Sequence, residues 1–284
     1  MAALAFAGPA TPAPPERFLG AFPWQVEDRR FGGFSALHVT ADGRRFVAVT
    51  DRGAFTTGGF RRGAGGRIEG VEAAPLRLLR GKGETPLRPD RRDSEGIAVM
   101  PGGTVFISLE GIEEARVLRY GRIDGPAENL PTPAAFATFG LNSALEALAI
   151  AADGTLYTLP EEAVQGVFPV WRFRNGTWNQ PFAIPADSGW LAVSAEIGPD
   201  GKFYLLERGF HGLAGFASRL RRFDLGAAGL TGGRVLIETE AGRHDNLEGL
   251  SLWRGPEGLV ATMISDDNFR FFQRTEFVEY LLPD

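Results

Sequence analysis

The sequence has no cysteine and only three histidines among its 284 residues. Without cysteine the chain forms no disulfide, no thiolate metal site and no thiol nucleophile. The histidines, His38, His211 and His244, share no spacing typical of metal ligands, and His38 lies on an alternating strand where a packing role is the simpler interpretation. A zinc site or a thiol-based enzyme is therefore not expected.

Long apolar runs and broad patches of positive charge are also missing. No apolar run approaches the roughly 20 residues that cross a bilayer. Acidic and basic residues are interspersed and give a formal net charge of -5, so there is no cationic surface for a nucleic-acid backbone or an anionic membrane. Neither is an expected partner.

The N-terminal end is rich in alanine and proline up to Pro15, ahead of the first patterned segment. We expect residues 1–19 to be a disordered leader or the remnant of a secretory signal. The expected domain is residues 20–284, in a periplasmic or secreted monomer.

Glycine and proline are abundant, with 38 and 19 residues, which favours many short strands joined by tight turns over long helices. One pattern recurs five times: an apolar alternating run, a turn at Asp-Gly or a related pair, and a second apolar run. The turn glycines lie 47 to 60 residues apart and are Gly43, Gly103, Gly154, Gly201 and Gly258. A repeat of this length holds about four strands, the size of one propeller blade.

The sequence thus predicts an all-β chain that forms a single β-propeller. Two segments outside the five copies, Phe22 to Phe31 and Arg274 to Leu282, are left to pair and to close the ring as a composite blade. Six blades are therefore favoured, with five as the alternative.

The first and last polar positions of each copy lie equally far from its turn. In an antiparallel hairpin such residues lie side by side at the open end, so blades arranged radially bring all of them to one surface. The set comprises Ser35, Asp51, Glu95, Glu110, Glu146, Glu161, Ser194, Glu207, Glu248 and Asp266.

Carboxylates gathered in this way raise each other's pKa unless cations compensate them. Ligands that are all oxygen favour a hard cation, with calcium first and magnesium or manganese second. The expected metal ligands are Glu95, Glu146, Glu248, Asp51 and Asp266.

Each of these acids also has a structural interpretation, because acids often end strands or cap turns. For Glu110, Glu161 and Glu207, an ion pair with a neighbouring arginine is an equal alternative. The run from Ser265 to Asn268 fits either a set of oxygen ligands or an Asx turn.

Several motifs together resemble a known family, the bacterial "esterase-like activity of phytase" (phytase-like) family. They are Gly33-Phe34-Ser35-Ala36-Leu37, Thr50-Asp51-Arg52-Gly53, Asp93-Ser94-Glu95-Gly96-Ile97, Asn142-Ser143-Ala144-Leu145-Glu146-Ala147-Leu148, Leu206-Glu207-Arg208, Asp245-Asn246-Leu247-Glu248-Gly249-Leu250, and Ser265-Asp266-Asp267-Asn268-Phe269 with Gln273-Arg274-Thr275. The resemblance implies a propeller-like domain whose repeated Glu and Asp residues carry a phosphoesterase or phosphodiesterase type of activity, in an exported protein. Ser194 departs from the expected pattern, since it stands where an acid is expected.

The first functional hypothesis is a calcium-dependent hydrolase of a small phosphorylated molecule, with Glu95, Glu146, Arg52 and Arg208 as catalytic residues. The arginines expected to bind phosphate oxygens are Arg52, Arg119, Arg208 and Arg274. A second hypothesis, by analogy of fold alone, is a metal-dependent lactonase or carboxylesterase. A third is a non-catalytic propeller whose acidic ring holds a structural ion or binds a cationic ligand or a protein.

Overall fold

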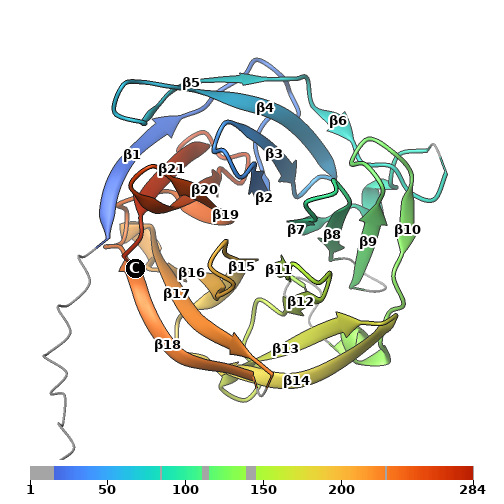
Figure 1. Ribbon diagram of the computed structural model, residues 1–284. Coiled ribbons are helices and arrows are strands. Elements are labelled where there is room, and N and C mark those ends of the chain that lie inside the picture. The colour runs from blue at the N-terminus through green and yellow to red at the C-terminus, as the bar shows by residue number, and fades with distance from the viewer. Residues whose placement is uncertain (1–15, 84, 111–114, 139–144, 228, 284) are drawn as a thin grey trace, which may run out of the picture.

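The chain forms five antiparallel sheets arranged around a central axis, as blades of one β-propeller (Figure 1). The structure is a computed structural model that describes residues 16–83, 85–110, 115–138, 145–227 and 229–283. The all-β fold predicted from the repeats is confirmed. No helix in these ranges is long and apolar enough to cross a membrane.

Each blade has four strands, and its innermost strand lies at the axis. From the axis outwards the blades are β2 (Phe34–Val39), β3 (Arg45–Thr50), β4 (Ala54–Arg62) and β5 (Ile68–Ala73); β7 (Ser94–Val99), β8 (Val105–Leu109), β9 (Arg116–Tyr120) and β10 (Ala127–Asn129); β11 (Ala147–Ile150), β12 (Leu156–Leu159), β13 (Val167–Arg174) and β14 (Thr177–Pro185); β15 (Leu191–Ile197), β16 (Phe203–Phe210), β17 (Phe216–Gly226) and β18 (Gly229–Glu238); and β19 (Asn246–Gly255), β20 (Gly258–Asp266), β21 (Glu276–Leu281) and β1 (Arg17–Pro23). A short strand, β6 (Arg77–Leu78), also pairs with β4. The 3-10 helices of the described residues, η1 (Pro89–Arg91), η2 (Ala134–Thr138) and η3 (Gly212–Ala214), lie in connections between strands.

The preferred count of six blades is wrong, and the reason lies in the two end strands. β1 and β21 do pair with each other, from Arg17 opposite Leu281 to Pro23 opposite Glu276. They do not form a sheet of their own, because β21 also pairs with β20. The fifth repeat supplies only β19 and β20, so the two ends complete it and close the ring at five blades. Because β1 starts at Arg17, the first propeller strand begins three residues before the expected boundary at residue 20, while residues 1–15 of the expected leader lie outside the described residues.

The core is divided among the spaces between neighbouring blades. Phe34 and Phe46 of the first blade meet Phe277 and Trp253 of the fifth, and Trp24 from the end of β1, in one buried cluster. Four further clusters join the other neighbouring pairs of blades in the same way. Burying an aromatic side chain of this size contributes about 2 kcal/mol, so the packing between blades holds each innermost strand in place.

The hairpins between the first two strands of each blade turn where the sequence predicted. At Gly103 and Gly154, for example, φ is 87° and 84°, a conformation that glycine adopts without the steric cost that a side chain would bring. All these turns lie at one end of the propeller. The opposite, open ends of the five hairpins together form what we call the channel mouth.

At the open ends, the partner of each acid differs by two residues from the symmetric pairing that the sequence predicted. Asp266 lies opposite Asn246 and not Glu248, and Glu207 lies opposite Ala192 and not Ser194. One of the two residues is due to a bulge near the start of the innermost strand, which recurs in β2, β7, β15 and β19. A bulge adds an unpaired residue and re-aims its side chain, so Glu248 leaves the regular alternation of its strand.

Candidate metal centre at the channel mouth

A compact group of carboxylates lies at the mouth between the second and third blades. Asp93 precedes β7, Glu95 lies in the bulge at the start of β7, and Glu110 follows β8. Ligand oxygens of these three residues all lie within 4.8 Å of one another. Glu146, which precedes β11, joins the group through a hydrogen bond between its carboxyl group and that of Glu110. We call these four residues the acidic group.

Burial and mutual repulsion set the protonation of the acidic group. Burial raises the pKa of Glu95 well above its usual range, and the charges of Asp93, Glu110 and Glu248 raise it further. The pKa of Glu146 is raised by burial first, and then by Glu95 and Glu110. A hydrogen bond between carboxyl groups also joins Glu95 to Asp93. Burial and the neighbouring carboxyl groups therefore both favour the protonated forms over the ionised forms, which would repel each other.

Arg208 neutralises negative charge on the opposite side of the mouth. It lies near the end of β16 in the fourth blade, and its guanidinium donates hydrogen bonds to Glu161 of the third blade and to Glu248 and Asn246 of the fifth. Asn246 in turn donates to Glu248, at 2.8 Å. Burial lowers the pKa of Arg208, but the charges of Glu248 and Glu161 outweigh burial and raise it above its usual value.

The two sides of the mouth therefore differ in charge balance. Glu161 and Glu248 share a buried arginine, whereas Asp93, Glu95 and Glu146 form no ion pair with any arginine or lysine that the structure describes. A bound cation would therefore relieve more repulsion between carboxylates beside Asp93, Glu95 and Glu146 than beside Arg208.

Asp51 and Asp266 lie at the rim of the mouth, between the acidic group and two loops. Burial raises the pKa of Asp51 to about 7, helped by the charge of Asp93, and burial with the charge of Glu248 raises the pKa of Asp266 to about 9. The Oδ1 atom of Asp51 is buried and has no hydrogen-bond partner among the described residues. Asp266 accepts a hydrogen bond from the backbone N–H of Asn268 at 2.7 Å, so the Asx turn is present here.

Arg52 stands at the same rim with its hydrogen-bonding groups free. Its guanidinium carbon lies 3.2 Å from the ring centroid of Phe269, in the loop between β20 and β21, so one face of the guanidinium is covered. Its N–H groups donate to no other described residue. Gly33 has a φ of 65° and packs against both Asp51 and Phe269, where any side chain would collide with the Asp51 carboxylate and the ring. This contact holds the loop before β2 against the loop between β20 and β21, beside Arg52.

Glu207 does not belong to the mouth. It is fully buried and forms paired hydrogen bonds with Arg219 and Arg221 of β17, at 2.7 to 3.1 Å. The ion-pair alternative is therefore confirmed for Glu207, and also for Glu161, whose partner is Arg208.

The remaining predicted positions have other places in the fold. Arg119 lies on β9 and pairs with Glu128 on the exposed outer strand β10, at 2.9 Å. Arg274 lies on the rim, where it pairs with Glu276. Ser35 donates a hydrogen bond to the carbonyl of Ser94, and so ties the first two blades together. Ser194 is buried in the middle of β15, and Asn142 to Ala144 lie outside the described residues.

Two residues at the mouth were missing from the sequence-based ligand set, Asp93 and Asn246. Each precedes a predicted ligand by two positions, in Asp93-Ser94-Glu95-Gly96 and in Asn246-Leu247-Glu248-Gly249. The signal that could have found both is the recurrence of Asp or Asn two positions before a Glu-Gly pair.

Comparison with known proteins agrees with the fold and the motifs. The catalytic domain of the GH62 α-L-arabinofuranosidase from Coprinopsis cinerea aligns with a TM-score of 0.55 at 13% identity, over 95% of this chain and 97% of that one. The α-L-arabinofuranosidase PaAbf62A from Podospora anserina aligns with a TM-score of 0.57 at 12% identity, over 95% and 98%. At such identities the likeness is one of fold alone. No curated protein matches the sequence.

The sequence model described as "Phytase-like: Esterase-like activity of phytase" matches residues 29–269, which include both sides of the channel mouth. This match confirms the resemblance carried by the motifs. The chain belongs to the phytase-like family.

Proposed function

We propose that the protein is a hydrolase of phosphoesters that depends on a divalent cation, calcium first, bound by the acidic group. The observation that carries this proposal is the unequal compensation of the mouth. Arg208 neutralises one side, while Asp93, Glu95 and Glu146 share only protons among themselves and with Glu110. Replacing those protons by a cation would relieve the repulsion that raises the pKa values.

The donor set fits a hard cation. All four members of the acidic group offer carboxylate oxygens, and those of Asp93, Glu95 and Glu110 are already within 4.8 Å of one another. Calcium accepts six to eight oxygens at about 2.3–2.6 Å in flexible geometry, so oxygens at this separation can share one ion. Asp51, with its unpartnered Oδ1, lies close enough to feel the charge of Asp93 and is the nearest candidate for a further ligand.

The chain's own residues supply the phosphate contact and the proton transfer. Arg52 offers free N–H donors beside the acidic group, and the ring of Phe269 holds its guanidinium in place. Glu146 lies outside the three residues whose oxygens converge within 4.8 Å, so its carboxyl group can accept a proton from attacking water or donate one to the leaving alcohol. Arg208 acts as a positioning residue, since its donors are engaged by Glu161, Glu248 and Asn246. A bound cation would neutralise phosphate charge and lower the pKa of bound water.

One observation favours a second candidate, a non-catalytic propeller with a structural ion. Glu95, Glu110 and Glu146 are each at most 9% exposed, so an ion held by all three would be largely enclosed. In that case the cation would stabilise the fold and no ester would be turned over.

The experiment is thermal melting of the metal-free protein in EDTA and then across a calcium titration, followed by assays on phosphomonoesters, phosphodiesters and lactones. A cation that binds only the folded state raises the melting temperature with its concentration. We expect a saturable rise that Glu95→Gln abolishes and that Glu128→Gln, an exposed acid of the same blade, leaves intact. Hydrolysis of a phosphoester should require calcium and should be lost in Glu95→Gln.

The results separate the candidates. A calcium-dependent rise without turnover of any ester would leave the structural ion as the answer. No rise with calcium, magnesium or manganese would refute the metal centre itself.

A further inference from the structure

We infer that a second pocket, on the rim of the channel mouth, binds the nucleobase of a nucleoside phosphate. The inference rests on the proposed function in one respect: the base belongs to the alcohol part of the ester whose phosphate is bound at Arg52 and the acidic group. We call this hollow the rim pocket.

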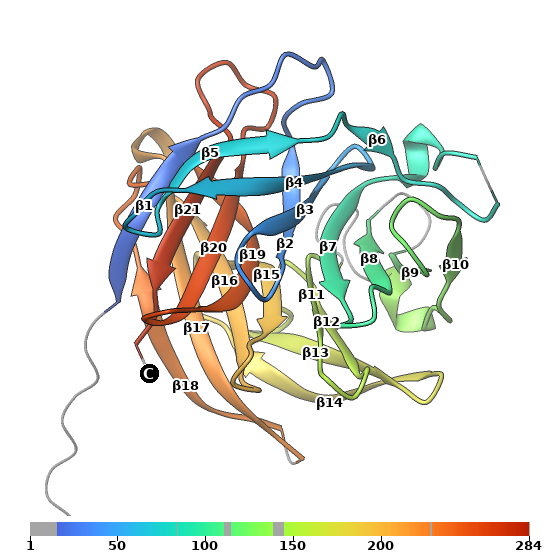
Figure 2. The same cartoon turned by 45° about the horizontal axis from the view of Figure 1, so that its top comes forward.

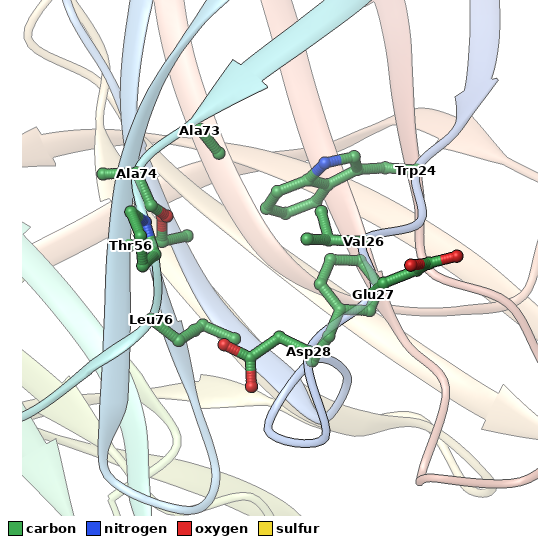
Figure 3. A pocket seen from close by; sticks show the side chains of 10 residues that line it. Trp24, Val26, Glu27, Asp28, Thr56, Ala73, Ala74 and Leu76 are labelled. Carbon is green, nitrogen blue, oxygen red and sulfur yellow. The ribbon is translucent and has the colours of Figure 1, made fainter.

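The rim pocket lies between the two loops that project beside the mouth. One loop joins β1 to β2 and the other joins β20 to β21, and Figure 2 shows both standing at the same end of the propeller. Its volume is ≈ 440 Å³, within the range of roughly 300–1,000 Å³ that is typical of small-molecule sites. An apolar pocket on the other side of the first loop, beside Trp24, Val26 and Leu76, is ≈ 200 Å³ and falls below that range (Figure 3).

Asp267 connects the rim pocket to the mouth. Its side chain lines the pocket, accepts a hydrogen bond from the backbone N–H of Gly33 at 3.0 Å, and contributes to the raised pKa of Asp51. The adjacent Gly32 packs against the same carboxylate. A ligand with its phosphate at Arg52 and its remaining part in the rim pocket would therefore cross the line of Gly32, Gly33 and Asp267.

One wall of the rim pocket is aromatic. Trp24 and Phe31 line it and pack edge to face, and Trp24 belongs to the core cluster between the first and fifth blades. Phe271 forms its outer edge and is 99% exposed. Its one ring contact among the described residues is the edge-to-face contact with Phe272. A phenyl ring left this open at the edge of a pocket is a ready surface on which a flat ring can stack.

The rim pocket is also lined by planar polar side chains that have hydrogen-bonding atoms without a described partner. The Gln25 amide makes no hydrogen bond with a described residue, and Gln273 uses only its Nε2, as a donor to Asp245. Arg274 uses Nε and Nη2 on Glu276, which leaves Nη1 free. A side-chain amide places a donor and an acceptor in one plane, which is the arrangement that reads the edge of a base.

These features favour a base over a sugar-like polyol. A polyol could also use the polar side chains of the pocket, which include Asp28 and Asp267, but it has no aromatic face to lay on the exposed ring of Phe271. A heterocycle can stack on that ring while its hydrogen-bonding edge meets the side-chain amides of Gln25 and Gln273.

The test is binding of adenosine, which has no phosphate, to the full-length chain in EDTA, with glucose as the polyol probe. Phe271→Ala and Phe272→Ala form a matched pair, because both rings are exposed and only Phe271 lines the rim pocket. We expect adenosine to bind, Phe271→Ala to weaken binding roughly tenfold or more, and Phe272→Ala to leave it unchanged. Gln25→Ala, which removes an exposed amide without a partner, should also weaken it.

The inference is overturned if adenosine does not bind, if the two phenylalanine variants behave alike, or if glucose competes equally well. The outcome does not depend on catalysis, since neither metal nor phosphate is present. If adenosine binds as expected and no phosphoester is hydrolysed with calcium, the proposed function fails and the base site stands. If simple phosphoesters are hydrolysed and adenosine does not bind, the reverse holds.

Discussion

Glu207 illustrates at the scale of single residues how an acid can be essential to the fold and remote from the chemistry. It is enclosed between Arg219 and Arg221, and Arg219 is also held by Asp187 and lies over the ring of Trp190. Glu207 and Arg208 are neighbours on β16 and point to opposite faces, so only one of them reaches the mouth. Glu207 therefore serves as a counter-ion inside the fourth blade.

Glu207→Gln should destabilise the protein strongly, because it leaves two buried guanidinium groups with no buried carboxylate. Breaking a buried pair costs about 3–5 kcal/mol, which for a chain of this size lowers the melting temperature on the order of 10 °C. Glu128→Gln is the control, since its pair with Arg119 is exposed and is expected to contribute at most about 1 kcal/mol. Thermal melting of both variants checks this, and equal losses would contradict it.

His38 lies at the other end of the channel, in a cavity of ≈ 70 Å³ lined by residues of all five innermost strands. Burial lowers its pKa to about 4. Glu196 lines the same cavity and is uncharged at that pH, because burial raises its pKa well above its usual range and outweighs the opposing hydrogen bond from the N–H of Leu252. It therefore offers no charge that would hold a proton on the imidazole.

The pKa of His38 makes stability depend on pH in a defined window. Below pH 6.5 the unfolded chain binds a proton at His38, whereas the folded chain binds it only near pH 4. Because the unfolded state binds more protons between these values, acid favours unfolding. Between these values the wild type should lose stability on the order of 2 kcal/mol more than His38→Gln. Denaturant unfolding of both proteins across this range is the measurement, and parallel pH profiles would show that His38 does not titrate as described.

At the scale of the element, the sequence determined the hairpins better than their open ends. Turn glycines and alternating apolar runs act locally, and Gly103 and Gly154 turn where predicted. The bulges at the starts of β7 and β19 depend on packing between blades, which no local pattern records. They shift the pairing by one residue and decide which carboxylates meet.

The candidate site was predictable to a similar extent. The repeat placed Glu95, Glu146 and Glu248 at one surface, as the structure does. Arg208 of the fourth blade binds both Glu248 of the fifth blade and Glu161 of the third. These three residues lie far apart in the sequence, so no local pattern predicts their contact. The division of the mouth into a compensated and an uncompensated side therefore emerged only from the fold.

At the scale of the whole molecule, the mouth exists only because the ring is closed. Its residues come from all five blades, and each blade is held by apolar clusters shared with its two neighbours. The ring closes through β1 and β21, which lie side by side in both overall views (Figures 1 and 2). Loss of this pairing would leave β21 as an open edge and free the fifth blade, which carries Glu248 and Asp266.

A chain that starts at Trp24 tests ring closure, because it lacks β1 and keeps the buried indole of Trp24. A chain that starts at Glu16 is the control, since it retains every residue of β1. Each lost ladder hydrogen bond costs about 1 kcal/mol, so the shorter chain should melt several degrees lower or more, and its exposed edge should promote self-association. Thermal melting and size-exclusion chromatography measure both effects, and a shorter chain that melts like the control would mean that the apolar clusters alone hold the ring closed.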